Sequence, residues 1–385
     1  MDELLTKEQR DLKYRAREVA EKYVRPQAAL LDREGRYPWE IMEKIVEYGL
    51  MGVWVPKEYG GGGGGIMELV LIVEELSKAC GGVGVAFAVN ALGSFPIMVG
   101  GNDDQKNTYL RDVATGKKFI AFCLSEKESG SDAGSLKTRA TKDGDTYIID
   151  GDKKWTTNAN AAQLYTVFAN LNPEKGMRGI GAFLVEKGHE GFTIGKEEDK
   201  MGIRCVPVHE THFNNCRIPA SQMLGKEGMG FMIAMATLDR ARPGVAAQAL
   251  GLAQGALDLA LGYASQRKQF GQTLLNFQAL QFMVADHATE IEAARQLVYA
   301  SARAVDMGAK NYSKISAMGK LFASDVAMKV TTDAVQIFGG YGYCRDYPIE
   351  KYMRDAKITQ IYEGTNQIQR LVIARNMIKE LASKT

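Results

Sequence analysis

The spacing of apolar residues changes twice along the chain, and this change limits the fold more than any other feature of the sequence. Apolar residues recur at helical intervals up to about residue 120, notably over residues 8–23, 38–50 and 67–80. Short alternating or β-rich runs replace them between residues 119 and 223. Helical spacing then returns. The order of helices, strands and helices predicts an α+β fold with segregated layers.

The middle stretch has the pattern of a compact antiparallel sheet. Strands are expected over residues 119–124, 147–150, 163–169, 180–185 and 211–218. Asp143-Gly144 and Asp150-Gly151 are dipeptides typical of hairpin turns. We therefore predict three domains: a helical one over residues 1–120, a β-domain over residues 121–224 and a helical one over residues 225–385.

The last domain has the strongest helical pattern. Residues at spacings of three and four form one long seam, namely Phe277, Leu280, Val284, His287, Ile291, Ala294, Val298, Ala302 and Val305. A helix over residues 324–338 is expected to end at Gly339-Gly340, and the last helix to start at Thr365 or Asn366. This last helix is expected to carry its apolar side chains inward, namely Ile368, Leu371, Ala374, Ile378 and Leu381.

Composition excludes several classes of protein. The 48 basic and 46 acidic side chains leave a net charge of +2, so the chain lacks the concentrated basic face of a nucleic-acid binder. The longest apolar run, residues 79–89, is about eleven residues against the roughly 18 that a membrane span needs. Five scattered cysteines are typical of free thiols in a reducing compartment. The acidic start has no signal or transit character, so we expect a cytoplasmic prokaryotic protein, or a mitochondrial matrix protein whose transit peptide has been removed.

Three features resemble functional signatures without the context that these require. The six glycines at residues 60–65 follow no strand and have no acidic residue about 20 positions later, so we interpret them as a flexible connection and not as a phosphate loop. His209 and His212 lie on a predicted strand that sends them to opposite sides, so no metal site is expected. His287 lies on the apolar seam, which favours a hydrogen-bonded core histidine.

Four separate segments are rich in small polar donors or in glycines that allow close approach. They are residues 122–131 after a strand, Trp155-Thr156-Thr157 on a strand, residues 267–271 at a helix break, and residues 336–340. A flat aromatic followed by hydroxyls suits a planar ring system, and a cationic helix end suits a pyrophosphate. Each segment alone also fits an ordinary strand or loop.

Glu363 is the candidate for acid–base chemistry. It lies in Ile361-Tyr362-Glu363-Gly364-Thr365, a short connection before the last helix. Its apolar neighbours exclude water and raise the pKa of the carboxyl, whereas the helix N-terminus lowers it. A carboxylate in this position can act as a general base.

Four motifs together resemble the acyl-CoA dehydrogenases over essentially the whole chain, and in particular their short-chain, butyryl-CoA-dehydrogenase-like members. They are FCLSEKESGSD at residues 122–132, RKQFGQTLLNFQ at 267–278, QIFGGYGY at 336–343 and IYEGTNQIQR at 361–370, in family order and at family-like spacing. The resemblance implies a helical N-terminal domain, a middle β-domain and a C-terminal four-helix bundle, in agreement with the apolar spacing.

The resemblance also implies a reaction. The family uses FAD to oxidise an acyl-CoA thioester to the trans-2-enoyl-CoA, and Glu363 matches the base that takes the pro-R α-proton while the β-hydride passes to flavin N5. The backbone N–H of Glu363 and a flavin ribityl hydroxyl would hold the thioester oxygen. Some members carry the base on the helix that here reads LDRARPG, but the matching residue is Ala241, which accepts no proton. Electron-transfer flavoprotein is the implied electron acceptor, and the family is usually a homotetramer.

Further site residues follow from the resemblance, position by position. Contacts near the flavin ring match Phe122, Cys123, Leu124, Ser125, Trp155, Thr156, Thr157, Thr365 and Gln367. Contacts to the FAD adenosine and pyrophosphate, donated by a neighbouring subunit, match Arg267, Phe270, Phe277, Gln278, Gln336, Ile337, Gly339 and Gly340. Substrate contacts match Ser131 on the CoA arm beside the cofactor, Asp239 and Arg242 near the pantetheine and nucleotide end, and Tyr362 and Gly364.

One departure from the family pattern follows the first strand. The family usually has Thr-Glu-Pro there, whereas this chain has Ser125-Glu126-Lys127. Serine keeps the hydroxyl, so the flavin contact is expected to persist. Loss of the proline frees the backbone, and Lys127 and Glu128 add charge at the mouth of the site.

The acyl group is expected to be apolar. Residues 82–101, which match the lining of the acyl end, contain no charged side chain, so the carboxylate of a dicarboxylyl-CoA would be left unpaired at a cost of several kcal/mol. A short, branched or alicyclic acyl group is favoured, and Asn90 and Ser94 are expected to add some polarity. Two alternatives stay open: an enoyl-CoA reductase that runs the same site in reverse, and a catalytically silent CoA-binding protein of the same fold.

Overall fold

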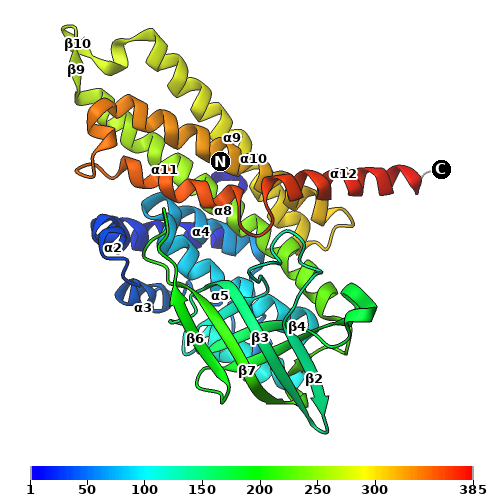
Figure 1. The fold of residues 1–385 in the computed structure, drawn as a ribbon. Helices are drawn as coiled ribbons and strands as arrows, with labels where there is room; N and C mark the ends of the chain where they lie inside the picture. The colour runs from blue at the N-terminus through cyan, green and yellow to red at the C-terminus, as the bar shows by residue number, and fades with distance from the viewer. Residues whose placement is uncertain (1, 384–385) are drawn as a thin grey trace.

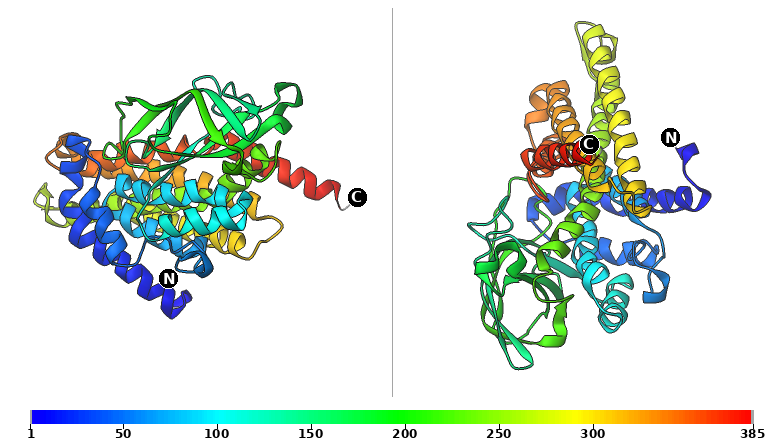
Figure 2. Two further views of the ribbon diagram at one scale, coloured as in Figure 1. Left: turned by 90° about the horizontal axis from the view of Figure 1, so that it is seen from below. Right: turned by 90° about the vertical axis from the view of Figure 1, so that its right-hand side faces the viewer.

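The computed structural model describes residues 2–383, in which helices from both ends of the chain pack together and the sheet formed by the middle lies on one side of them (Figures 1 and 2). The N-terminal part is helical, as predicted. Its α-helices are α1 (Lys7–Val19), α2 (Ala28–Glu34), α3 (Trp39–Glu47), α4 (Ile66–Ala79), α5 (Gly81–Gly100), α6 (Asp103–Gln105) and α7 (Arg111–Ala114). Short 3₁₀ or π turns join them, namely η1 (Asp2–Leu4), η2 (Ala20–Val24), η3 (Arg25–Gln27), η4 (Lys57–Tyr59) and η5 (Lys106–Leu110).

The six consecutive glycines are not the flexible connection that the sequence predicts. Their backbone N–H groups donate to the segment before them, for example Gly63 to the Val55 carbonyl at 2.9 Å and Gly64 to the Val53 carbonyl at 2.8 Å. A Cβ added at Gly61 would lie 2.1 Å from the Val55 carbonyl oxygen. The glycines therefore allow two backbone segments to pack in direct contact, which any side chain would prevent.

The middle part forms a twisted sheet with the strand order β6-β7-β3-β2-β4-β5-β8 and with β1 on β4. Its strands are β1 (Ile120–Cys123), β2 (Arg139–Asp143), β3 (Thr146–Thr157), β4 (Leu164–Asn170), β5 (Ile180–Glu186), β6 (Phe192–Glu197), β7 (Val208–Pro219) and β8 (Met223–Leu224), with the turns η6 (Pro173–Gly179) and η7 (Ala220–Gln222). The predicted antiparallel sheet is only partly correct, because β1 and β2 both pair with β4 in parallel. The sequence pattern also missed β2 and β6, whose exposed polar residues weaken the apolar alternation.

One of the two predicted hairpin turns is confirmed. Gly144, with φ +58°, turns the chain between β2 and β3. The second prediction, at Asp150-Gly151, is wrong. Gly151 lies inside β3 at a shift in its register with β7, and a Cβ there would lie 2.7 Å from the Cα of Thr138. This dipeptide therefore forms a β-bulge. A β-bulge favours glycine just as a hairpin turn does.

The C-terminal part is helical and is built around the long helix α8, which packs against α4, α5, α9 and α10. Its helices are α8 (Gly230–Gln266), α9 (Gln278–Asp306), α10 (Tyr312–Phe338), α11 (Ile349–Lys357) and α12 (Asn366–Ala382). The connections include the hairpin β9 (Lys268–Gln269) and β10 (Gln272–Thr273), and the turns η8 (Leu274–Asn276), η9 (Gly339–Tyr343) and η10 (Ile358–Gln360).

The predicted seam of α9 is confirmed from His287 onward, where its residues are buried. Earlier seam residues such as Leu280 and Val284 are only partly buried, because this end of α9 and the β9-β10 hairpin extend beyond the other helices (Figure 1). His287 itself is buried, as predicted, with Nε2 3.0 Å from an oxygen of Asp333, but neither ring nitrogen makes the expected hydrogen bond among the described residues. The predicted caps are confirmed: Gly339, at φ +62°, ends α10, and Thr365 caps α12 by accepting from the Ile368 N–H at 3.3 Å.

The expectation that α12 carries its apolar residues inward is wrong. Leu371, Ile378 and Leu381 are 48%, 67% and 66% exposed. The helix projects from the body of the chain, as the views in Figures 1 and 2 show. Only its first turns, which contain the buried Asn366 and Gln369, are anchored.

Two helices are long and apolar enough to cross a membrane by length and composition, α5 and α8. This differs from the sequence estimate, which counted only uninterrupted apolar runs. In each, 78% of the most apolar 18-residue window is buried inside the fold. Their apolar character is therefore accounted for by the core, where α8 crosses both α4 and α5.

Candidate active site

Glu363 has a strained backbone conformation. It lies between η10 and α12 with φ +52°, in the left-handed region that side chains other than glycine rarely adopt, and Gly364 follows at φ +91°. The described residues include six such non-glycine positions, and three of them, Trp155, Phe270 and Glu363, are site residues that the sequence predicts. Strain of this kind persists only where surrounding contacts impose it, and it concentrates at functional sites.

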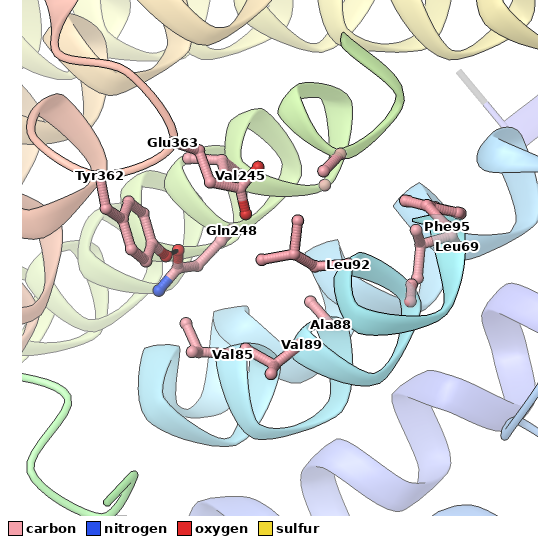
Figure 3. A pocket seen from close by; sticks show the side chains of 13 residues that line it. Leu69, Val85, Ala88, Val89, Leu92, Phe95, Val245, Gln248, Tyr362 and Glu363 are labelled. Carbon is pink, nitrogen blue, oxygen red and sulfur yellow. Dashed lines mark hydrogen bonds between the residues drawn. The ribbon is translucent and has the colours of Figure 1, made fainter. Parts of the chain in front are cut away.

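The carboxylate of Glu363 opens onto a pocket between α5 and α8 (Figure 3). Its lining is mainly apolar and comprises Leu69, Val85, Ala88, Val89, Ala91, Leu92, Phe95, Ala241, Gly244 and Val245. The polar lining residues are Gln248, Tyr362 and Glu363.

Asn90 and Ser94 do not supply the polarity that the sequence predicts for this pocket. Asn90 accepts from the Ile120 N–H at 3.1 Å and donates to the Ala86 carbonyl at 3.0 Å. Ser94 accepts from the indole N–H of Trp54 at 2.9 Å. Both are fully buried and outside the pocket lining, because they face the other side of α5. The pocket at Glu363 is therefore more apolar than the sequence indicates.

The Glu363 carboxyl combines burial with nearby positive charge. Its Oε2 atom is buried and has no hydrogen-bond partner among the described residues. Burial raises the pKa of Glu363 to about 7, while the charges of Arg242 and Lys320 act to lower it. A carboxyl with such a pKa is ionised to a useful extent near neutral pH and is still basic enough to take a proton.

Two residues that the sequence analysis did not single out hold the loop around Glu363. The hydroxyl of Tyr362 donates to the side-chain oxygen of Gln248, whose amide donates to the Gly81 carbonyl at 3.2 Å. Lys320 donates to the Gly364 carbonyl at 2.8 Å. Neither Gln248 nor Lys320 belongs to a distinctive motif, so no local sequence signal marks them.

Arg242, expected near the pantetheine and nucleotide end of the substrate, acts on Glu363 from α8. Its side chain is buried, forms an ion pair with Asp239 one helical turn away, and acts electrostatically on Glu363. Arg242 is thus shielded from solvent, whereas Asp239 is partly exposed. Ser131 is exposed on the loop after β1.

The residues expected near the flavin ring divide into accessible and buried groups. Trp155 is 55% exposed, and Ser125 and Thr157 are partly exposed. Cys123 and Thr156 are buried, and the Thr156 hydroxyl lies 3.6 Å from the Cys123 sulfur. The expectation that the Thr156 hydroxyl faces a ring is therefore wrong, since β alternation turns it into the core of the sheet.

The other residues expected near the ring lie on or just after the first strand and at the last helix. Phe122 is partly buried, Leu124 is buried, and Thr365 and Gln367 lie at the start of α12 beside Glu363.

The loop with the unusual Ser125-Glu126-Lys127 sequence is ordered without the proline. The buried Glu126 carboxylate accepts from Lys153 Nζ at 2.6 Å and from the Lys137 and Thr138 N–H groups at 2.6 and 3.1 Å. Glu126 and Ser129 also exchange two backbone hydrogen bonds. These contacts replace the rigidity that a proline would supply.

The residues expected to contact the FAD adenosine and pyrophosphate lie far from the sheet within one chain. Arg267 and Phe270 are at the β9-β10 hairpin, and Phe277 and Gln278 follow it at the start of α9. This hairpin and the sheet lie at opposite ends of the molecule (Figure 1). Gln336, Gly339 and Gly340 are exposed at the end of α10, and Ile337 is buried. Within one chain, the residues expected near the flavin ring therefore lie apart from those expected at the adenosine and pyrophosphate.

Comparison with known proteins assigns the chain to a family. Models of the acyl-CoA dehydrogenase N-terminal, middle and C-terminal domains match residues 6–117, 121–216 and 228–378. The short-chain specific acyl-CoA dehydrogenase of Clostridium acetobutylicum is 47% identical over 98% of this chain and 100% of its own length. The chain belongs to the acyl-CoA dehydrogenase family.

Two further relatives of this acyl-CoA dehydrogenase bear on its reaction. The acryloyl-CoA reductase (NADH) of Anaerotignum propionicum is 46% identical over 98% of this chain and 96% of its own length. A solved chain from a study of the electron transferring flavoprotein of Acidaminococcus fermentans is 50% identical, with a TM-score of 0.96 over 98% of this chain and 99% of that one. As a family member, the chain is a flavin oxidoreductase.

The residues of this acyl-CoA dehydrogenase fit the FAD that its family uses. A Cβ added at Gly271, Gly339 or Gly340 would meet no atom within 4 Å, so backbone is open to a ligand at both segments expected to hold the adenosine and pyrophosphate. Arg267 and Gln336 are exposed there and offer a cation and an amide. Among residues 2–383, no group of three or more His, Cys, Asp and Glu side chains is placed to hold a metal ion.

Proposed function

We propose that this enzyme removes hydrogen from Cα and Cβ of a short, branched or alicyclic apolar acyl-CoA, with Glu363 as the base that takes the α-proton. The supporting observation is the position of Glu363. It is the carboxylate of a pocket with an otherwise mainly apolar lining, and its Oε2 atom has no partner among the described residues. An acyl chain in this pocket would be desolvated, with its α-carbon next to a carboxylate of raised pKa.

The backbone around Glu363 also fits the charge that develops on the thioester oxygen. Among residues 2–383, no backbone or side-chain acceptor takes a hydrogen bond from the Glu363 N–H, which lies in a left-handed turn. A preorganised N–H at that oxygen stabilises the enolate-like charge where it forms. FAD, when bound, supplies the acceptor for the hydride; we place its ring by Ser125, Trp155 and Thr157, and its adenosine and pyrophosphate by Arg267, Gln336 and the Gly339-Gly340 backbone.

A second copy of the chain is part of this proposal. The two groups of FAD contacts lie at opposite ends of one chain, so a complete site needs both from different copies. We therefore propose a homo-oligomer, in agreement with the tetramer that the resemblance implies. Electron-transfer flavoprotein is the proposed electron acceptor, supported by the similar chain from the Acidaminococcus fermentans study.

The central test is the variant Glu363→Gln, purified with its flavin. We expect a yellow protein that binds acyl-CoA normally and has a turnover lower by at least about a hundredfold, because general-base catalysis is lost. Anaerobic bleaching of the flavin by a panel of acyl-CoAs measures cofactor, reaction and substrate together. A colourless wild-type protein that binds no added FAD, or near-normal turnover of the variant, would contradict the proposal.

Reduction of an enoyl-CoA is a second candidate, because the Anaerotignum propionicum relative is a reductase. Both directions use the same residues, so they differ in electron partner and not in the pocket. Steady-state assays with an enoyl-CoA and NADH, with and without electron-transfer flavoprotein, distinguish them. Faster enoyl-CoA reduction than acyl-CoA oxidation under matched conditions would favour the reductase.

A further inference from the structure

Lys320 is a buried lysine at the back of the loop that contains Glu363. It comes from the middle of α10, is fully buried, and forms no ion pair with any residue in the described part of the chain. Its ammonium donates to the Gly364 carbonyl at 2.8 Å and to the Asn366 side-chain oxygen at 3.0 Å. Burial of an ammonium without a paired carboxylate is unfavourable, so a neutral residue would satisfy a purely structural need at lower cost.

The contacts of Lys320 fix the C-terminal side of the turn at Glu363. Gly364 directly follows Glu363, and Asn366 is the first residue of α12. Asn366 also donates to Ser324 Oγ at 2.9 Å and to Asp325 at 2.8 Å, both on the same helix as Lys320. The strained backbone of Glu363 is thus anchored to α10 on its C-terminal side.

We propose that Lys320 is a positioning residue for the dehydrogenation: its ammonium holds the Glu363-Gly364 turn, and its positive charge favours the ionised form of the Glu363 carboxyl. This inference rests on the proposed function, in which Glu363 is the base. Lys320 itself is not among the residues that line the pocket.

The electrostatics around the pair agree with this role. Burial lowers the pKa of Lys320 to about 7, and the negative charge of Glu363 acts to raise it. The positive charges of Arg242 and Lys320 act in turn to lower the pKa of Glu363. The other groups that face the pair are Arg242 on α8 and Asp325 on α10, with Tyr362 beside Glu363. Each member of the pair thus stabilises the charged form of the other.

The test separates the charge of Lys320 from its hydrogen bonds by comparing the pH dependence of kcat/KM in Lys320→Gln, Lys320→Met and Lys320→Arg. Glutamine keeps a donor but loses the charge, so we expect the acidic limb of the profile to move to higher pH. Its rate at high pH should return to within a few fold of wild type. Methionine should show the same shift and a lower limiting rate. Arginine keeps the charge and should keep the wild-type limb.

Lys329→Met is the matched control, since Lys329 is also on α10 but pairs with Glu290 at the surface. We expect no change of the acidic limb in this variant. Infrared difference spectra measure the pKa of the Glu363 carboxyl without turnover. The carboxyl band of Glu363 is identified as the one that is missing in Glu363→Gln. The band should titrate at higher pH in Lys320→Gln than in wild type.

The outcomes distinguish the inference from the proposed function. Near-normal turnover of Glu363→Gln would overturn both. An inactive Glu363→Gln variant combined with a wild-type acidic limb and a wild-type carboxyl titration in Lys320→Gln would overturn only the role of Lys320. If methionine prevents folding, the glutamine variant alone decides, because it retains the donor to Gly364.

Discussion

The phenolic hydroxyl of Tyr362 donates a hydrogen bond to the side-chain oxygen of Gln248 on α8, and the Gln248 amide continues this connection to the Gly81 carbonyl at the start of α5. The residue before Glu363 is therefore tied to both helices that form the acyl pocket. Gln248 therefore links the position of Glu363 to the width of the pocket.

We expect Tyr362→Phe to destabilise the protein by about 1–3 kcal/mol, because the variant leaves the buried Gln248 oxygen without its donor. The turnover should fall as well, since the Glu363 loop loses one of its anchors. Urea unfolding and steady-state kinetics measure the two effects. Tyr14→Phe, at a site that is 66% exposed, is the control and should change neither. Unchanged stability in Tyr362→Phe would show that the Gln248 contact is not needed.

Glu363→Gln is expected to gain stability over wild type as the pH rises. Burial raises the folded-state pKa of Glu363 from 4.5 to about 7, so folding favours the protonated carboxyl. Its contribution to stability is therefore fully present below the unfolded pKa and is lost as the pH rises through about 7. Urea unfolding at about pH 5 and about pH 8.5 measures the difference between the variant and wild type. A difference that does not grow with pH, or one that Glu43→Gln at the surface reproduces, would contradict the raised pKa.

Gly244→Ala is expected to narrow the range of acyl groups. A Cβ at Gly244 would meet only Leu69, at 4.0 Å, so the added methyl enters the pocket. We expect kcat/KM to fall more for branched and alicyclic acyl-CoAs than for a short straight chain. Stability should rise by up to about 1 kcal/mol, because alanine is the better helix former.

Gly262→Ala is the matched control for this change. Gly262 lies on the same helix, is exposed, and a Cβ there would meet no atom within 4 Å. It should give a similar gain in stability with unchanged selectivity. An equal loss of kcat/KM for all acyl groups in Gly244→Ala would mean that the residue does not limit the acyl end.

Gly61→Ala tests the revised interpretation of the glycine run. The added Cβ would lie 2.1 Å from the Val55 carbonyl oxygen, so the two backbone segments have to separate. We expect a loss of about 1–3 kcal/mol in the free energy of unfolding, as for overpacked cores. Gly130→Ala, where a Cβ would meet nothing within 4 Å, should be nearly neutral. Equal stability of the two variants would restore the flexible-loop interpretation.

The order of layers, most of the helices and the caps at Gly339 and Thr365 were predictable because each depends on residues close in sequence. The errors arose where the same residues suit two different local structures. Gly151 satisfies a bulge as well as a turn, and the glycine run suits tight backbone contact as well as flexibility. The apolar residues of α12 have a helical period, but nothing in a local pattern shows whether the rest of the chain covers them.

The candidate base was marked by the sequence, whereas the residues that hold its loop were not. Glu363 belongs to a motif that resembles a known family, and its strained backbone adds independent evidence. Lys320 and Gln248 belong to helices whose local sequence is ordinary, and they meet the Glu363 loop only after α8, α10 and the chain before α12 have packed. Their roles depend on tertiary contacts between residues 44 and 114 positions apart in sequence.

The separation of the two groups of FAD contacts has a genetic consequence. A chain with a damaged β9-β10 hairpin still carries the residues expected near the flavin ring, after β1 and at the end of β3, and a chain damaged there still carries an intact hairpin. If neighbouring copies complete each other's site, two defective alleles expressed together would restore part of the activity that each lacks alone. Such complementation would be absent if every copy bound its flavin unaided.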